Sequence, residues 1–359
     1  MALISKIIIY LSIIIFAFGQ LLRIDFKGLS FPLIDISILA IFCLNIFQKI
    51  KDKDLKIKNK YFLYFLIFAW LSFIINFFRY QIDSISPLLY LLRLTCLISF
   101  FIFPLNLKDK NSKNFFIIAI ISNLIFGLIQ YFIWPNFTYF NSQNWDPHLF
   151  RLVGAFFDPT FTAFIYLMFL IYLYLNSKIP YRWLLMITAY FAMILTYSRS
   201  AYLSFLLAFT FIAFKKKNIK IFLISFVLIV STILLLPRQE GEGTKLERTS
   251  SITAKIENYK EAFSTFKKAP IIGHGYNNLY FVRDIKIQNS HANFGFDSSL
   301  MTILTTTGII GLLLFLLGLK NYFIRADLTH QSIIIALLLH SLFANSLLYP
   351  WILLFLIFI

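Results

Sequence analysis

The sequence predicts an all-α integral membrane protein that crosses the bilayer many times. Of its 359 residues, 59% are hydrophobic and 14% are charged, and the mean hydropathy is +0.78. Apolar stretches of about 17 to 24 residues, each long enough to cross a hydrocarbon core of about 30 Å, recur along nearly the whole chain. A soluble domain of this size does not need so much apolar surface.

We expect eleven or twelve transmembrane helices, because a helix satisfies its own backbone hydrogen bonds in lipid. The first span has no convincing cleavage site and is expected to remain as an anchor. In the last stretch, 331–359, Asn345 and Pro350 leave open whether the chain forms one tilted helix or two short crossings. The other spans are predicted near 4–22, 30–47, 61–78, 88–105, 114–134, 159–175, 183–197, 200–214, 219–236 and 296–319.

The net charge of +17 is explained by the orientation of these spans and needs no nucleic-acid partner. With a cytoplasmic N-terminus, the inner connections are rich in lysine, as in QKIKDKDLKIKNK and KKKNIK. The outer segment 135–150 contains neither lysine nor arginine. Since inner loops carry the excess of positive charge in membrane proteins, this asymmetry predicts the orientation.

One long hydrophilic excursion interrupts an otherwise single membrane domain of residues 1–359. It covers residues 237–295 and is expected on the periplasmic side. Near 251–269 its apolar residues recur at spacings of four and three, which predicts an amphipathic helix on the membrane surface or over the helix bundle. These apolar residues are Ile252, Ile256, Tyr259, Phe263 and Phe266.

Neither a disulfide framework nor a metal site is expected. Cys43 and Cys96 both fall inside predicted spans. The sequence has no HExxH, cysteine pair or phosphate-binding glycine loop, so metal and nucleotide chemistry have no signature. PIIGHGYNN contains glycines but does not fit a dinucleotide-binding pattern.

The stretch RLVGAFFDPT places Arg151 and Asp158 at the outer end of the sixth span. In a structural interpretation, Asp158 caps the helix that begins at Pro159, and Arg151 reaches a lipid phosphate. In a functional interpretation, the positive helix N-terminus and the arginine together bind an anionic group. Both interpretations predict the same helix start, and the sequence leaves them open.

Other unusual polar side chains gather on the same side of the predicted bundle. Arg199 lies at the turn between spans seven and eight, Arg93 lies in the outer half of span four, and Asp297 opens span ten. A charge at the bilayer centre costs about 2.5–3.5 kcal/mol on insertion scales, so such residues are candidates for function. Together they predict a cationic outer cavity suited to a phosphate or diphosphate. The long loop adds Arg248, His274 and His291.

Aromatic side chains in the outer segment NFTYFNSQNWDPHLF suggest a second kind of contact. Trp145 and His148 are candidates for stacking on a sugar. The alternative is an interfacial location, where aromatic residues are common in membrane proteins.

Taken together, these segments resemble the superfamily of O-antigen polymerases and O-antigen ligases of bacterial envelopes. The resemblance covers about residues 150–320, and the N-terminal part contributes only hydropathy. Four segments carry it in the order typical of the superfamily: RLVGAFFDP, LTYSRSAYLSF, the loop with Arg248 that leads into ENYKEAFSTFKKAPIIGHGYNN, and DSSLMTILTTTGIIG.

The resemblance implies a location in the bacterial inner membrane and a substrate carried on undecaprenyl diphosphate at the periplasmic face. It implies that Arg151, Arg199 and Arg248 bind the diphosphate or an acidic part of the substrate. An acceptor hydroxyl would attack the anomeric carbon with help from a base, and the arginines would stabilise the leaving diphosphate. Neither a metal nor another cofactor is required in such a scheme.

The position of the base distinguishes two branches of the superfamily. Its ligases resemble one another in a His-Asn pair eleven residues before the first glycine of a Gly-x-x-Gly. Gly308 and Gly311 match these glycines, but Asp297 and Ser298 stand where the pair is expected, and His291 lies six residues earlier. This departure favours the polymerase branch, in which Asp297 is either the base or a helix cap.

The resulting hypothesis is a polymerase that moves a growing O-antigen, or a related surface glycan, onto another lipid-linked repeat unit. The alternatives are a ligase that moves the glycan to lipid A core or to protein, and a flippase or transporter for the same lipid-linked sugar. A chain-length regulator and a flippase of the same pathway are the expected partners. The expected catalytic residues are Asp297, Arg199, Arg248 and His291, and the expected substrate-binding residues are Arg151, Asp158, Arg93, His274 and Trp145.

Overall fold

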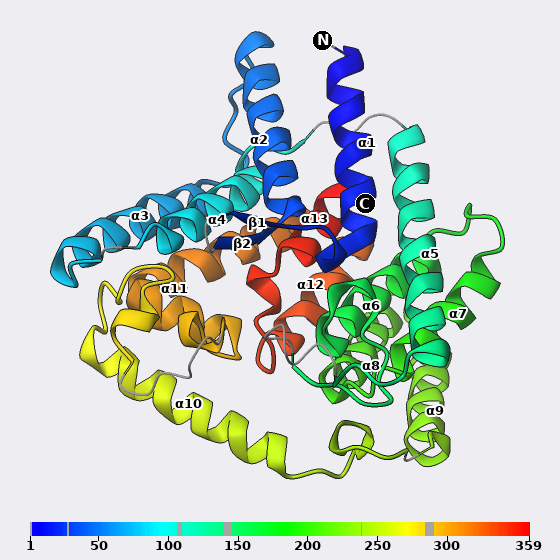
Figure 1. Ribbon diagram of the computed structural model, residues 1–359. Coiled ribbons are helices and arrows are strands. Elements are labelled where there is room, and N and C mark those ends of the chain that lie inside the picture. The colour runs from blue at the N-terminus through cyan, green and yellow to red at the C-terminus, as the bar shows by residue number, and fades with distance from the viewer. Residues whose placement is uncertain are drawn as a thin grey trace.

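The computed structural model describes residues 2–26, 29–82, 84–105, 110–138, 146–237, 239–283 and 291–359 and is dominated by α-helices (Figure 1). The first half contains α1 (Ala2–Phe18), α2 (Leu33–Lys51), α3 (Lys60–Arg79), α4 (Ser86–Ile102), α5 (Lys110–Ile133) and α6 (Pro159–Leu175). The second half contains α7 (Arg182–Ile194), α8 (Arg199–Lys215), α9 (Ile219–Leu235), α10 (Ser250–Lys268), α11 (Ser299–Arg325), α12 (Leu328–His340) and α13 (Pro350–Phe358).

Four of these helices are long and apolar enough to cross a membrane: α2, α3, α5 and α11. Shorter apolar helices include α4, α6, α7, α9 and α12. The structure is therefore that of a helical membrane protein, and the helix bounds lie close to the predicted spans. The count of eleven or twelve crossings stays a prediction.

Two features depart from a row of uninterrupted helices. A short antiparallel hairpin of β1 (Arg23–Phe26) and β2 (Leu29–Pro32) connects α1 to α2, and β2 takes up the first residues of the span predicted near 30–47. The C-terminal stretch, whose form the sequence left open, is broken between α12 and α13 by a 3-10 turn at Ser346–Leu348.

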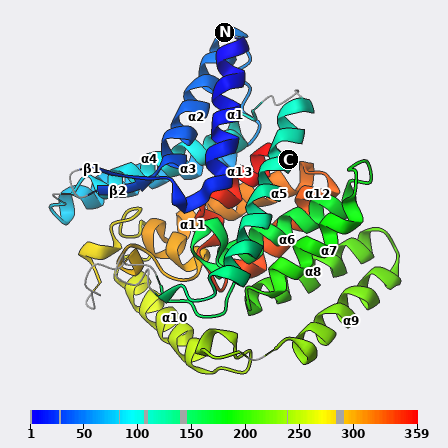
Figure 2. The same ribbon diagram turned by 45° about the vertical axis from the view of Figure 1, so that its right-hand side comes forward.

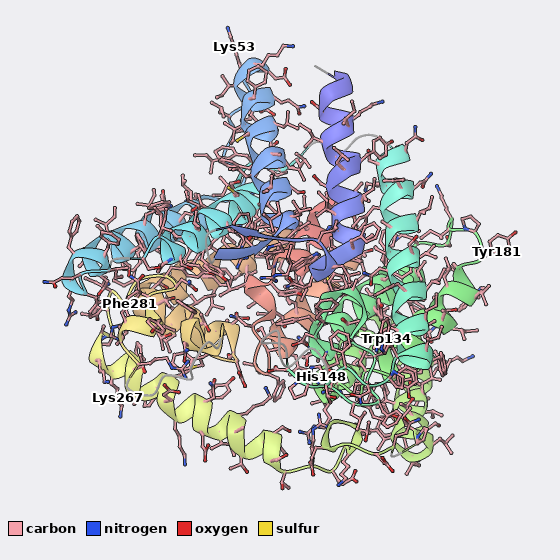
Figure 3. The ribbon with its side chains drawn as sticks, viewed as in Figure 1. Lys53, Trp134, His148, Tyr181, Lys267 and Phe281 are labelled. Carbon is pink, nitrogen blue, oxygen red and sulfur yellow. The ribbon has the colours of Figure 1, made fainter. Side chains whose placement is uncertain are left out.

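Helix α6 forms the centre of the molecule. Its residues from Thr162 to Ile171 are buried on every side, which fits a helix that is apolar all round. It packs against α7, α8 and α12, while α11 packs along α3. In both views, α10 runs along the side opposite the N-terminus (Figures 1 and 2). The lysine-rich connection marked by Lys53 lies at the other end from His148 and Lys267 (Figure 3).

A break inside α11 is filled by the loop that follows α10. Gly308 has φ 65° and ψ −171°, a conformation outside the helical region, so it interrupts the helix after Thr307. The amides of His274 and Gly275 donate to the carbonyls of Thr305 and Thr306 at 3.0 and 2.8 Å. The Ile309 amide likewise donates to Pro270 at 2.9 Å. The loop therefore satisfies backbone groups that the break exposes.

The glycines at this contact are required by geometry. A Cβ at Gly308 would lie 2.1 Å from the carbonyl oxygen of Ile271, and a Cβ at Gly273 would lie 2.4 Å from the backbone of Thr306. Both glycines also have positive φ. The Gly-x-x-Gly of the sequence thus begins at a point where two backbones touch, which explains its first glycine structurally.

We predict that Gly308→Ala lowers the free energy of unfolding by at least about 1–3 kcal/mol, because it adds a steric overlap to an unfavourable backbone conformation. The measurement is thermal unfolding of the purified protein in detergent. Gly295→Ala is the matched control, since the nearest atom to its added Cβ would be 3.4 Å away. Equal melting temperatures for the two variants would contradict this account of the break.

Candidate functional site

Helix α10 turns a polar strip towards the protein and its apolar strip outward. Ile252, Ile256 and Phe263, which the sequence places on the apolar face, are about half exposed. The apolar strip faces outward because hydrogen bonds from the polar strip beside it attach α10 to the starts of α8 and α11. The strip facing the protein consists of Ser251, Lys255, Asn258, Ala262 and Thr265.

Arg199 connects the first turn of α8 to the beginning of α10. Its Nη1 donates to the carbonyls of Leu246 and Arg248 at 3.1 and 2.9 Å, and its Nη2 donates to Ser251 Oγ at 2.5 Å. Arginine has five N–H donors, so these three contacts leave two for another group. Arg199 therefore has a structural role and retains the capacity to bind an acceptor.

Arg151 and Arg248 both contact the turn at Gly243. Arg151 is 8% exposed, and its Nε donates to the carbonyl of Thr196 at 2.8 Å. The absence of a side chain at Gly243 makes room for it, since a Cβ there would lie 2.6 Å from Arg151 Cδ. Arg248 donates to the carbonyls of Gly243 and Lys245 at 2.7 and 2.8 Å. Backbone carbonyls thus hold both guanidinium groups.

The three arginines form a cluster of positive charge in which Asp158 acts on Arg151, and Glu242 and Glu247 act on Arg248, only at longer range. Burial and the neighbouring Arg248 lower the pKa of Arg151 to about 10. Burial and Arg199 also lower the pKa of Arg248. Within the described part of the chain, none of the three forms an ion pair with a carboxylate. We call these residues, Arg151, Arg199 and Arg248, the arginine cluster; its chemistry suits a multiply charged anion.

His148 lies beside the arginine cluster. Burial and the charges of Arg151 and Arg248 lower the pKa of its imidazole to about 3, so the ring is neutral near pH 7. Its Nε2 is buried and has no hydrogen-bond partner among the described residues. A neutral imidazole nitrogen in this place provides a polar atom for a bound molecule.

Asp158 caps α6, as the structural interpretation of the sequence predicts. One carboxylate oxygen accepts from the amides of Thr160 and Phe161 at 2.6 and 3.0 Å, and Pro159 is the first residue of the helix. Burial raises the pKa of Asp158, while these two amides and Arg151 oppose that shift. The capped helix start thus lies within electrostatic reach of the arginine cluster.

Asp297 precedes α11 and is not its cap, because the Ser298 side chain takes that position. Asp297 Oδ2 is 3.2 Å from Lys255 Nζ, and the Asp297 amide donates to Asn258 Oδ1 at 3.0 Å. The side chain is 48% exposed. Of the two roles that the sequence left open, the cap belongs to Ser298, and the half-exposed carboxylate stays a candidate base.

Helix α10 connects Asp297 to the arginine cluster. Ser251 contacts Arg199, and Lys255, one turn further along the same strip, contacts Asp297. Four residues of α-helix cover about 6 Å along its axis. The two contacts are therefore held in a fixed relation by one rigid element.

Two other candidates are engaged in structural contacts elsewhere. Arg93 of α4 forms an ion pair with Asp35 of α2 at 3.2 Å and lies over the Tyr90 ring at 4.4 Å. His274 is 2% exposed and lies between the Tyr80 hydroxyl, 2.7 Å from Nδ1, and the Thr265 carbonyl, 2.9 Å from Nε2. These contacts compensate the Arg93 charge and occupy both ring nitrogens of His274, so their substrate-binding roles stay predictions.

The side chains of the remaining two candidates, His291 and Trp145, lie outside the described part of the structure. His291 begins the 3-10 turn His291–Phe294, and its side chain lies outside the described part of the structure. Trp145 also lies outside the described residues.

The sequence does not single out Lys255, Ser251 and Asn258, and it offers only sugar stacking or an interfacial location for His148. Lys255 and Ser251 share a spacing of four in SITAKIENYKEAFSTFKKA, but the apolar pattern of that helix is the stronger signal. No local pattern marks His148 as a neighbour of Arg248, since the two residues are 100 sequence positions apart and only the fold brings them together.

We predict that His148 makes the fold sensitive to acid. Its pKa is about 3 in the folded protein and 6.5 in the reference state, so protonation favours the unfolded chain as the pH falls through this window. In His148→Gln, the loss of melting temperature between pH 7.5 and pH 4.5 should be smaller than in the wild type by a few degrees. The difference in melting temperature between the two proteins at pH 7.5 is the internal control, because it reports the effect of the substitution when the imidazole is neutral. Parallel curves across this range would contradict the buried neutral imidazole.

Comparison with known proteins supports the family suggested by the motifs. Residues 183–316 match a family model described as O-antigen ligase. The matched part includes Arg199, Arg248 and Asp297 but ends before the C-terminal break, and it begins after Arg151 and Asp158. No curated protein matches the chain. Residues 183–316 are therefore similar to the O-antigen ligase family, which supports the superfamily that the motifs resemble.

Proposed function

We propose that this protein is a glycosyltransferase of the inner membrane that polymerises a glycan carried on undecaprenyl diphosphate at the periplasmic face. The arginine cluster is the observation that carries the proposal. Three guanidinium groups lie within electrostatic reach of one another, and among the described residues none of them forms an ion pair with a carboxylate. A diphosphate supplies the negative charge that this arrangement lacks.

The proposed reaction uses the arginine cluster and Asp297. The acceptor hydroxyl oxygen forms a bond to the anomeric carbon of the donor, and the bond from that carbon to the diphosphate oxygen breaks. The arginine cluster stabilises the charge that develops on the leaving diphosphate. Asp297 accepts the proton of the hydroxyl, while Lys255 and Asn258 hold its side chain and amide in place.

Asp297 in place of a histidine favours a polymerase over a ligase, and the description of the matching family favours a ligase. Both reactions use the same donor and the same leaving group. They differ in the acceptor, which is another lipid-linked repeat unit for a polymerase and lipid A core or protein for a ligase. The acceptor is therefore the variable to test.

We predict that the purified protein, incubated with its undecaprenyl diphosphate-linked repeat unit alone, produces a ladder of longer lipid-linked chains on a gel. Lipid A core and nucleotide are omitted, so that neither ligation nor sugar activation contributes. Product that forms only when lipid A core is added would overturn the polymerase proposal and identify a ligase. If neither acceptor gives product with protein that binds the donor, glycan transfer itself is wrong.

We predict that Arg151→Ala lowers turnover in this assay by about 10²–10³-fold, because it removes charge stabilisation from the leaving group. Arg151→Lys should retain part of the activity, since it keeps the charge. Asp297→Asn should lower turnover by about 10²–10⁴-fold, because the amide cannot accept the proton.

The matched controls come from the same part of the chain. Lys245→Ala removes an exposed cation near the cluster, and Glu257→Gln removes an exposed carboxylate of α10. Both should be near wild type in activity. Membrane level and melting temperature are measured for every variant. Full activity in Arg151→Ala or in Asp297→Asn would remove that residue from the mechanism.

A further inference from the structure

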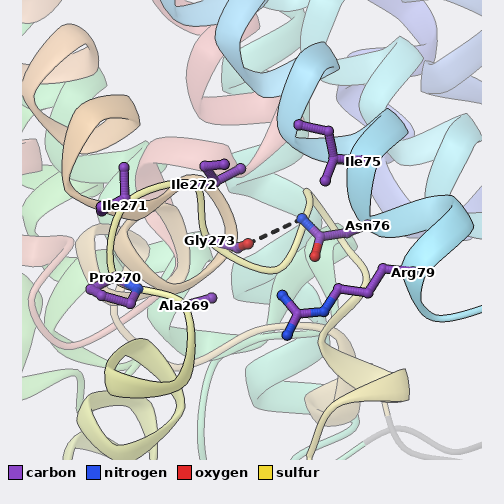
Figure 4. A pocket seen from close by; sticks show the side chains of 8 residues that line it. All are labelled: Ile75, Asn76, Arg79, Ala269, Pro270, Ile271, Ile272 and Gly273. Carbon is purple, nitrogen blue, oxygen red and sulfur yellow. Dashed lines mark hydrogen bonds between the residues drawn. The ribbon is translucent and has the colours of Figure 1, made fainter.

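A cavity of about 200 Å³ lies between the last turn of α3 and the loop that follows α10 (Figure 4). It is separate from the arginine cluster and shares no residue with it. Its wall is mostly apolar, with Ile75 on the helix side and Pro270, Ile271 and Ile272 on the loop side. Two polar side chains, Asn76 and Arg79, also line it, together with Ala269 and Gly273.

Asn76 has an acceptor that no described residue satisfies. The side chain is 1% exposed, and its Nδ2 donates to the carbonyls of Ser72 and Gly273 at 2.8 and 3.0 Å. Its Oδ1 is buried and has no hydrogen-bond partner among the described residues. Figure 4 shows this oxygen on the side of the cavity where Arg79 lies. A buried acceptor without a hydrogen-bond partner costs free energy, so this position favours a ligand that carries an N–H or O–H donor.

Arg79 adds a positive charge at the same place. It is the last residue of α3, it is exposed, and its guanidinium lies 5.5 Å from the centre of the Tyr80 ring. In the described part of the chain it forms no ion pair with a carboxylate. The cavity therefore pairs a donor for an anion with an acceptor for a neighbouring N–H or O–H group.

The position of the cavity identifies the kind of molecule that fits it. Helix α3 has 20 residues and is long and apolar enough to cross a bilayer, so Arg79 at its end lies at the level of the lipid headgroups. Ile75 and Ile271 are 42% and 59% exposed, which continues the apolar surface of the helix into the cavity. A ligand with a charged head and apolar chains matches this arrangement.

We propose that this cavity binds a membrane phospholipid whose headgroup carries a hydrogen-bond donor. Its phosphate contacts Arg79, its ammonium or hydroxyl group donates to Asn76 Oδ1, and its acyl chains lie along Ile75 and Ile271. Phosphatidylethanolamine and phosphatidylglycerol have both groups. Phosphatidylcholine has the phosphate but no N–H or O–H donor in its headgroup. This proposal is independent of the glycan chemistry and rests only on the membrane location of the chain.

Occupation of the cavity would stabilise the loop that fills the break in α11. The loop wall of the cavity includes Pro270, whose carbonyl accepts from the Ile309 amide of α11, and Gly273, which lies against the backbone of Thr306. A lipid held between Arg79 and this wall would oppose separation of the loop from the helix. The expected sign of lipid binding is therefore an increase in melting temperature.

The test uses the full chain, purified and delipidated in detergent, with each of the three phospholipids added in turn. Native mass spectrometry counts bound lipid, and thermal unfolding reports the stabilisation. Phosphatidylethanolamine and phosphatidylglycerol should bind about tenfold more tightly than phosphatidylcholine, because the hydrogen bond to Asn76 Oδ1 is lost with choline. Arg79→Ala should weaken binding of either lipid about tenfold, and Arg79→Lys should weaken it less.

Arg182→Ala is the matched control, since Arg182 is also an arginine at a helix end, where it lies over the Trp183 ring at 4.6 Å. It should bind lipid as the wild type does.

A photoactivatable phosphatidylethanolamine should label the peptides that contain Ile75 and Ile271, which keeps the test valid if Arg79→Ala is less stable. Equal binding of the three lipids, equal binding by Arg79→Ala, or labelling elsewhere on the chain would overturn the proposal. So would selective uptake of a polyprenyl diphosphate, which would assign the cavity to the glycan donor.

Discussion

The outer part of this structure depends on one constraint: a break in an apolar helix must have its backbone groups satisfied by protein. Gly308 interrupts α11, and the loop through Pro270 and Gly275 supplies the missing partners from its own backbone. Ser72 of α3 adds a hydroxyl between the carbonyls of Ile272 and Thr306, at 2.7 and 3.1 Å. Because α11 and the loop meet through main-chain atoms and α3 adds side-chain hydrogen bonds to both, the start of α11 and the end of α10 are fixed relative to the bundle.

That fixed frame explains how positive charge is held without carboxylate partners. Backbone carbonyls contact Arg151, Arg199 and Arg248, which orients the guanidinium groups while leaving their net charge in place. Carboxylates appear instead at Arg93 and Arg283, whose ion pairs join helices or loops. The molecule thus uses arginine in two ways: paired with an acid where it fastens segments, and held by carbonyls where charge is concentrated.

Local signals in the sequence are sufficient for most elements. Asp158 followed by Pro159 predicts the start of α6, and Gly308 marks a place where only glycine fits. The facing of α10 was less predictable, since its apolar strip is turned outward by hydrogen bonds that depend on Asp297 and Arg199. Likewise, Arg93 is compensated by Asp35, 58 positions away. Contacts between distant segments need the tertiary packing, which periodicity and spacing in one sequence do not contain.

The straight helix between Ser251 and Asn258 has a consequence for how this protein can vary. An inserted or deleted residue there would turn Lys255 and Asn258 by about 100° relative to Ser251, since an α-helix has about 3.6 residues per turn. The contact with Arg199 would then survive only by giving up the two contacts with Asp297. Length in this segment is therefore constrained more tightly than residue identity. The residues of the outward strip make none of these hydrogen bonds, so one apolar side chain there can replace another.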